Sequence, residues 1–108
     1  MKKYQVRVTS EAEKDIEDIY DYIAKKDSNQ NAEFVFNKIE GLILALNQNP
    51  ERGNYPPELS RQGIHEYREV MFKPYRIIYE TLDSKVIVHI CADGRRDMKS
   101  LLERRLLR

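Results

Sequence analysis

The sequence predicts an α+β domain in which a helical hairpin packs on one face of a mainly antiparallel sheet. Two apolar stripes with helical spacing lie within residues 10–46, and three apolar, strand-like segments separated by tight turns follow within residues 65–91. A short alternating segment precedes them and a short helical segment ends the chain, which gives the order β-α-α-β-β-β-α. Strands joined by tight turns pair antiparallel, and amphipathic helices need an apolar surface to cover, so we expect two layers.

The N-terminal half provides the first strand and the hairpin. Residues 4–8 alternate apolar and polar side chains, as in a half-buried strand. Ser10 stands three residues before Glu13, a capping-box spacing, and opens a first helix that runs to Lys26. The polar residues 27–31 separate the two helices and also supply a cap for the second. The first stripe consists of Ala12, Ile16, Ile19 and Ile23, and the second of Ala32, Val35, Phe36, Ile39, Leu42, Ile43 and Leu46.

The C-terminal half provides the rest of the sheet. A loop rich in Asn, Gly and Pro spans residues 47–64, and its length indicates either ordering by contacts or a functional role. The strands expected after it are His65–Phe72, Tyr75–Glu80 and Lys85–Cys91, with turns at Lys73-Pro74, Asp83-Ser84 and Asp93-Gly94. The terminal helical segment contains Met98, Leu101, Leu102 and Leu106, and Ser100 stands at a capping-box spacing from Glu103.

Length and composition restrict the class of protein. A chain of 108 residues is expected to form one domain, residues 1–108. It has no apolar run of the length that spans a membrane and no signal-peptide pattern at its N-terminus, so we expect a cytoplasmic protein without membrane contacts. The single Cys91 forms no internal disulfide or cysteine-based zinc site, and we interpret it as a small buried residue. We expect no metal and no cofactor.

The net charge of +1 hides a segregation of charge along the chain. Residues 10–40 carry nine acidic and four basic side chains, whereas residues 61–108 carry seven acidic and eleven basic ones. Such asymmetry bears on binding partners rather than on the fold. It is consistent with a basic surface that binds a target, but charge alone favours the alternative of an ordinary solvated surface with scattered ion pairs.

Arginines at strand and turn positions are the main candidates for chemistry, because nucleophile, phosphate-loop and metalloprotease motifs are absent. The guanidinium group suits phosphate and carboxylate, and a basic cluster stabilises charge on a phosphorane-like transition state. The alternative is that Arg68 and Arg76 pair with neighbouring glutamates, Glu66, Glu69 or Glu80. We interpret Tyr75 and Tyr79 as packing residues and His89 as a sheet residue. The candidate target- or nucleic-acid-binding set is Arg68, Lys73, Arg76, Arg95, Arg96 and Lys99.

The order of these motifs resembles the RelE/ParE family of toxins from bacterial type II toxin–antitoxin systems, and is closer to its ParE-like members. The matching segments are Tyr67-Arg68-Glu69, residues 73–80 with the Y-R-I-I-Y strand, the apolar residues 86–90, residues 93–98 with the Arg-rich turn, and Pro50 to Gly53 as a P-x-x-G segment. The resemblance implies a compact toxin held inactive by an antitoxin from the same operon. It also implies one of two targets: DNA gyrase, or messenger RNA in the ribosomal A site.

The resemblance carries residue roles with it. In ribonuclease members, basic residues of the sheet and a tyrosine near the C-terminus carry cleavage. Arg76 matches the family's arginine in the Y-R strand. Arg96 (or Arg95) matches the family's arginine after the last strand, and Arg68 matches a lysine on a strand. These three are the catalytic set if the chain is a ribonuclease. Leu102 stands near the place of the terminal tyrosine, and no tyrosine follows Tyr79.

We therefore expect a toxin that inhibits gyrase by binding. The alternatives are a ribosome-dependent mRNA endoribonuclease, or a decayed toxin that acts as corepressor with its antitoxin. Contact with operator DNA is expected only through the antitoxin. The leucines Leu101, Leu102 and Leu106 form a candidate antitoxin contact, since an exposed apolar tail is unfavourable. The alternative is that these leucines cover the sheet.

Overall fold

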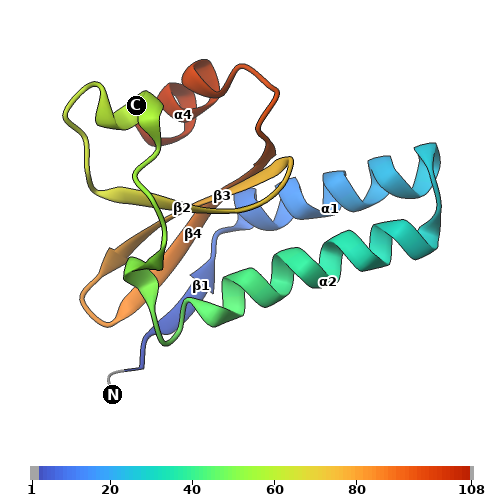
Figure 1. Cartoon of the computed structure of the whole chain (residues 1–108), viewed down its shortest axis with the longest axis horizontal. Helices are drawn as coiled ribbons and strands as arrows, with labels where there is room; N and C mark the ends of the chain where they lie inside the picture. The colour runs from blue at the N-terminus through green and yellow to red at the C-terminus, as the bar shows by residue number, and fades with distance from the viewer. Residues whose placement is uncertain (1–2, 108) are drawn as a thin grey trace.

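The computed structural model describes residues 3–107 and shows one four-stranded sheet with helices on both faces (Figure 1). The elements are β1 (Gln5–Val8), α1 (Ser10–Lys26), α2 (Asn29–Ala45), the 3-10 turn η1 (Pro50–Arg52), α3 (Pro57–Ser60), β2 (Tyr67–Phe72), β3 (Tyr75–Leu82), β4 (Lys85–Asp93) and α4 (Met98–Leu106). The predicted α+β class and order of elements are confirmed. None of the helices within residues 3–107 is long and apolar enough to cross a membrane.

The sheet has the strand order β1-β4-β3-β2. β2, β3 and β4 form the predicted antiparallel meander, and β1 pairs parallel to β4 at the edge. Strand boundaries differ from expectation at the ends: β2 begins at Tyr67 rather than His65, and β4 continues to Asp93. The expected loop 47–64 is ordered by η1, α3 and a bridge between Asn54 and Glu69.

Both hairpin helices begin at a side-chain cap from a residue whose own backbone is extended. Thr9, not Ser10, caps α1, because its backbone still has the extended conformation of β1 and its hydroxyl accepts a hydrogen bond from the amide of Ala12. Ser28 caps α2 in the same way, as predicted for the polar break. The second capping-box prediction was wrong: Asp97 caps α4 three residues earlier, by accepting hydrogen bonds from Ser100.

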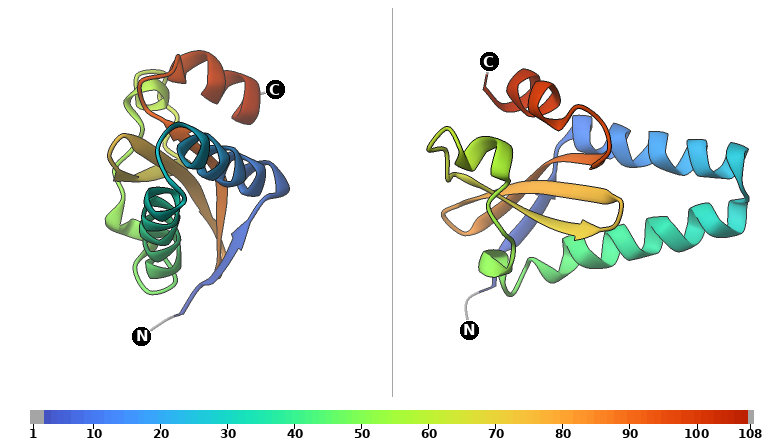
Figure 2. Two further views of the ribbon diagram at one scale, coloured as in Figure 1. Left: turned by 90° about the vertical axis from the view of Figure 1, so that its right-hand side faces the viewer. Right: turned by 45° about the horizontal axis from the view of Figure 1, so that its top comes forward.

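The two faces of the sheet carry separate apolar clusters. The face under α1 and α2 buries residues of the two predicted stripes together with Val70, Ile77, Tyr79, Val86, Val88 and Cys91. The opposite face is covered by α3 and α4, so that the sheet lies between α4 and α2 (Figure 2). The expected two layers are thus present, and the structure adds a partial third layer. Its buried residues are Leu59, Ile78, Ile90, Ala92, Met98, Leu101 and Leu102.

A β-bulge lets β4 serve both clusters. Ile78 pairs with Ile90 but Tyr79 pairs with Val88, so His89 is the extra residue. Two backbone groups of β4 near the bulge are satisfied by side chains from other elements: the Asp15 carboxylate accepts from the amide of Cys91 (3.1 Å), and Arg105 donates to the carbonyl of His89 (2.8 Å). Arg105 also donates to Asp15 (3.0 and 3.2 Å), which joins α4 to α1.

Candidate functional site

The register of the β2–β3 hairpin places Arg68 and Arg76 on opposite faces of the sheet. Residues that pair directly across antiparallel strands point to the same face. Arg68 pairs with Tyr79, which faces the α1–α2 layer, whereas Arg76 pairs with Met71 and faces α3. The two arginines therefore do not converge on one substrate-sized position.

Arg68 holds the long loop against the sheet. Its guanidinium group donates to the carbonyl of Gly53 (2.9 Å) and to the hydroxyl of Tyr55 (3.0 Å), and it lies over the Tyr55 ring with the guanidinium carbon 4.4 Å from the ring centroid. The loop is anchored a second time by Tyr79, whose buried hydroxyl donates to the Pro50 carbonyl (2.6 Å) and accepts from the Gly53 amide (3.1 Å). The Pro50–Gly53 segment is thus fixed by β2 and β3.

Arg76 is enclosed by two carboxylates. Its side chain donates from Nε to Glu69 (2.6 Å) and from both Nη atoms to Glu58 of α3 (2.8 Å each), and the residue is only 8% exposed. The hydrogen bonds that Arg76 donates to Glu58 lower the pKa of the Glu58 carboxyl and raise the pKa of Arg76. The alternative of a glutamate partner for Arg76 is confirmed by the Glu69 pair. Its longest-range partner, Glu58, was not foreseen.

Four exposed basic residues belong to the end of the sheet where the β2–β3 turn meets the β4–α4 loop, or to the start of α4 beside it. The amide of Gly94 donates to the carbonyl of Pro74 (2.7 Å), which holds the two turns together. We call this surface the basic end; it comprises Lys73, Arg95, Arg96 and Lys99, all exposed. Arg95 is paired with Asp93 (2.6 Å) and lowers the pKa of that carboxyl. Among residues 3–107, Lys73, Arg96 and Lys99 have no ion-pair partner.

The leucines of α4 cover the sheet. Leu101 and Leu102 are buried in the α3–α4 cluster, and Leu106 is partly buried against it. The alternative interpretation, that these leucines cover the sheet, is thus the arrangement observed. An antitoxin could contact these side chains only if α4 left the sheet. The ion pair between Arg105 of α4 and Asp15 of α1 opposes that movement.

The other two candidate titratable residues, His89 and Cys91, lie in environments that indicate a structural role. His89 pairs with Glu80 (2.7 Å) on the sheet, and Cys91 is buried, which raises the pKa of its thiol to about 12. A thiol with so high a pKa is a poor nucleophile near neutral pH. Within the described part of the chain, no group of three His, Cys, Asp or Glu side chains is arranged to hold a metal ion.

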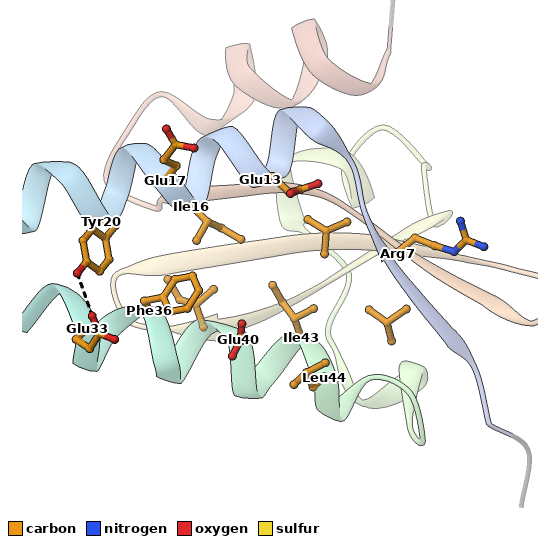
Figure 3. A pocket seen from close by; sticks show the side chains of 13 residues that line it. Arg7, Glu13, Ile16, Glu17, Tyr20, Glu33, Phe36, Glu40, Ile43 and Leu44 are labelled. Atoms are coloured by element: carbon orange, nitrogen blue, oxygen red, sulfur yellow. Dashed lines mark hydrogen bonds between the residues drawn. The ribbon is translucent and has the colours of Figure 1, made fainter.

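An open groove between α1 and α2 was not foreseen by the sequence interpretation (Figure 3). It has a volume of about 700 Å³, and Ile16, Phe36 and Ile43 lie among its apolar lining residues beside Val6 and Val8 of β1. Tyr20 donates to Glu33 (2.9 Å) from one helix to the other within this lining (Figure 3). The sequence carried a signal for this groove: glutamates flank both apolar stripes at helical spacing, Glu13 and Glu17 on α1 and Glu33 and Glu40 on α2.

Comparison with known proteins agrees with this fold. A family model described as "ParE toxin of type II toxin-antitoxin system, parDE" matches residues 6–99. A structure of the chromosomal ParDE toxin–antitoxin system from P. aeruginosa superposes with a TM-score of 0.70 at 15% identity, covering 83% of this chain and 95% of that one. The RelBE2 toxin–antitoxin complex from Mycobacterium tuberculosis gives a TM-score of 0.62 at 17% identity, covering 84% of this chain and 98% of that one. No curated protein matches the sequence.

The matched model spans most of the chain, and the class that fold and sequence define is a type II toxin of the RelE/ParE superfamily. Within that class, the chain belongs to the ParE toxin family. The resemblance seen in the Y-R-I-I-Y strand and the Arg-rich turn is thereby confirmed.

Proposed function

We propose that this toxin arrests growth by binding DNA gyrase through the basic end, without bond chemistry of its own, and that a cognate antitoxin neutralises it. The observation that carries the proposal is the separation of the three arginines that match the ribonuclease set. Arg68 and Arg76 face opposite sides of the sheet, and Arg76 is held by three hydrogen bonds to Glu58 and Glu69. Of these three arginines, Arg96 alone has no ion-pair or loop partner within residues 3–107 and could contact a phosphorane-like transition state.

The composition of the chain supports the same proposal. No tyrosine follows Tyr79, so the terminal tyrosine of ribonuclease members has no counterpart in α4, where Leu102 is buried. Lys73, Arg96 and Lys99 are exposed and form no ion pair with any residue between 3 and 107, as expected of residues that contact a partner with complementary charge. The antitoxin is inferred from the solved relatives, which are described as toxin–antitoxin systems or complexes.

The test is induction of the full chain in a host that lacks the antitoxin, with DNA integrity and messenger RNA followed side by side. We expect growth arrest with a DNA-damage response and intact mRNA. A variant with Lys73, Arg96 and Lys99 all changed to Ala should need about tenfold more protein for the same arrest, because three charged contacts are lost. A control variant with Arg61, Lys85 and Arg104 changed to Ala removes the same charge from other exposed positions and should remain toxic.

Each other result assigns a different function. Translation-dependent cuts in mRNA that disappear in the Lys73/Arg96/Lys99 variant would make the chain a ribosome-dependent ribonuclease. Absence of any growth effect from a folded chain would overturn the inhibitor proposal in favour of a decayed toxin that acts as corepressor. Equal toxicity of the two triple variants would remove the basic end as the target-binding surface.

A further inference from the structure

The basic end continues onto the helical hairpin as a row of aromatic side chains. α1 and α2 extend beyond the β2–β3 turn (Figure 2), and Tyr22 and Phe34 lie in the parts of the two helices next to their connection. Both side chains are well exposed, at 64% and 53%. From the turn, Phe72 lies edge-on to the Phe34 ring (centroids 6.1 Å apart), and Tyr75 interacts electrostatically with Tyr22. We call Tyr22, Phe34, Phe72 and Tyr75 the aromatic row.

The aromatic row and the groove between α1 and α2 lie on different sides of the hairpin. Tyr20 and Phe36 line the groove, and Tyr22 and Phe34 each stand two positions away from one of them. Two positions along an α-helix correspond to a rotation of roughly 200°. The rings of Tyr22 and Phe34 therefore point away from the groove, and the row is a separate surface.

Cations stand beside the rings of this row. The Lys38 ammonium group lies 5.5 Å from the centroid of the Phe34 ring. Lys73 follows the second phenylalanine of the row directly in the turn, and Arg95 interacts electrostatically with both tyrosines of the row. All three cations are exposed. Rings and positive charges thus alternate along one surface.

The carboxylates of the β4–α4 loop do little to cancel this charge. Asp93 accepts hydrogen bonds from Arg95, and Asp97 accepts from Ser100 at the start of α4. Within residues 3–107, the other cations of the basic end form no ion pair. The surface is therefore suited to a polyanion.

The rings decide which polyanion fits. The bases of an unpaired nucleic-acid strand stack on aromatic side chains, while its phosphates contact lysine and arginine. An acidic protein segment would use the cations alone, because the negative face of an aromatic ring disfavours a carboxylate. A second copy of this chain would bring two basic ends together and is disfavoured.

The proposed target, gyrase, acts on DNA, so DNA is the strand that this toxin would meet there. We propose that the aromatic row and the basic end together bind an unpaired DNA strand, with bases stacked on the rings and phosphates held by the cations. The toxin would then contact the DNA that gyrase holds in addition to the enzyme itself. The choice of DNA rests on the proposed function, but the binding is tested apart from it.

The probe is a fluorescein-labelled, single-stranded oligothymidine of about twelve nucleotides, titrated with the full chain and followed by fluorescence anisotropy. We expect its affinity to fall about tenfold from about 50 to about 200 mM salt, as for roughly two to three phosphate contacts. A duplex of the same length should bind several-fold more weakly, because its bases are already stacked on each other.

Variants of the chain test the stacking. Tyr22→Leu with Phe34→Leu keeps an apolar surface but removes two rings, and should weaken binding of the single strand about tenfold. Tyr22→Phe with Phe34→Tyr keeps both rings and should bind like the wild type. The matched control, Leu44→Ala with Leu82→Ala, changes exposed apolar residues outside the row and should also bind like the wild type.

A second measurement needs no variant. In the NMR spectrum of the wild type, the ring protons of Tyr22 and Phe34 should shift upfield when the oligothymidine is added, because stacked bases shield them. The ring protons of Tyr55, an exposed tyrosine outside the row, should not shift.

Several results would overturn the proposal. These are unchanged binding by the leucine variant, equal affinity for duplex and single strand, or ring protons that do not shift. Tighter binding of an oligouridine of the same length would overturn the assignment to DNA. Binding to vesicles of anionic lipid but not to the oligonucleotide would assign the surface to a membrane. Growth arrest without oligonucleotide binding would refute the DNA contact alone, and binding without growth arrest would refute the toxin function alone.

Discussion

Replacing Arg76 with Ala should lower the free energy of unfolding by about 3–5 kcal/mol, the largest effect expected from any exchange of a charged residue in this chain. The substitution leaves Glu69, with 4% of its side chain exposed, and the partly buried Glu58 without their common cation. Buried carboxylates without a counter-charge are unfavourable, and α3 loses its bidentate tie to β3. Urea denaturation followed by circular dichroism measures the change.

The matched control is Arg96→Ala, at an exposed arginine with no ion-pair partner in the described part of the chain, which should change stability by less than about 0.5 kcal/mol. Equal stability of the Arg76 variant and the wild type would show that the enclosed ion pairs contribute nothing. The structural role of Arg76 also means that loss of toxicity on its removal is no sign of catalysis. For this reason the functional test above uses residues of the basic end.

The same ion pairs predict a dependence of stability on pH. The pKa of Glu58 is lower in the folded chain than in the unfolded one, mainly because of the hydrogen bonds from Arg76. A group of this kind stabilises the fold fully above its unfolded pKa, near 4.5, and the contribution is lost as the pH falls through the lower, folded pKa. The wild type should therefore lose stability below about pH 4.5, and Arg76→Ala should reduce the part of that loss which comes from Glu58.

Replacing Gly53 with Ala should destabilise the protein by about 2–5 kcal/mol, through overpacking and a lost buried hydrogen bond. A Cβ at this position would lie 2.5 Å from the carbonyl oxygen of Glu69 and 2.5 Å from the hydroxyl of Tyr79. Neither atom moves freely, because one belongs to the backbone of β2 and the other is buried in two hydrogen bonds. The loop would have to move away, and Arg68 would lose its acceptor on Gly53.

Gly41 provides the matched control for this substitution. A Cβ at Gly41 meets nothing within 4 Å, and the residue lies inside α2. Gly41→Ala should therefore raise the free energy of unfolding by about 1 kcal/mol, since alanine favours the helix. Thermal unfolding of the two variants beside wild type measures both effects. A Gly53 variant as stable as wild type would mean that the loop is not held against β2.

Much of the fold was predictable because it depends on local spacing. The stripes of α1 and α2, the three strands of the meander and the turn at Lys73-Pro74 are all written in residues that are neighbours in sequence. Even the opposed directions of Arg68 and Arg76 follow from that turn, since a two-residue connection pairs Phe72 with Tyr75 and fixes every partner before it. Tyr75 and Tyr79 are four residues apart on one strand and so share a face; both pack in the core, as predicted, and the structure adds that this face lies under the helical hairpin.

The partners of the polar groups required the tertiary structure. Glu58 and Arg76 are 18 residues apart, and Asp15 and Arg105 are 90 residues apart, so no local pattern pairs them. The bulge at His89, which lets β4 build two clusters, shifts the alternation by one residue and is visible only in the register. The groove likewise depends on how α1 and α2 lie over β1 (Figure 3).

The sequence by itself thus determined the class of fold and the family, because apolar periodicity and the Y-R-I-I-Y and Arg-rich segments are properties of contiguous residues. Only the tertiary structure decided which arginines are free to meet a partner. A guanidinium group pairs with whichever carboxylates and carbonyls the folded chain brings within hydrogen-bonding distance. The tertiary fold, not the spacing of residues in sequence, brings Glu58 to Arg76 and the Gly53 carbonyl to Arg68.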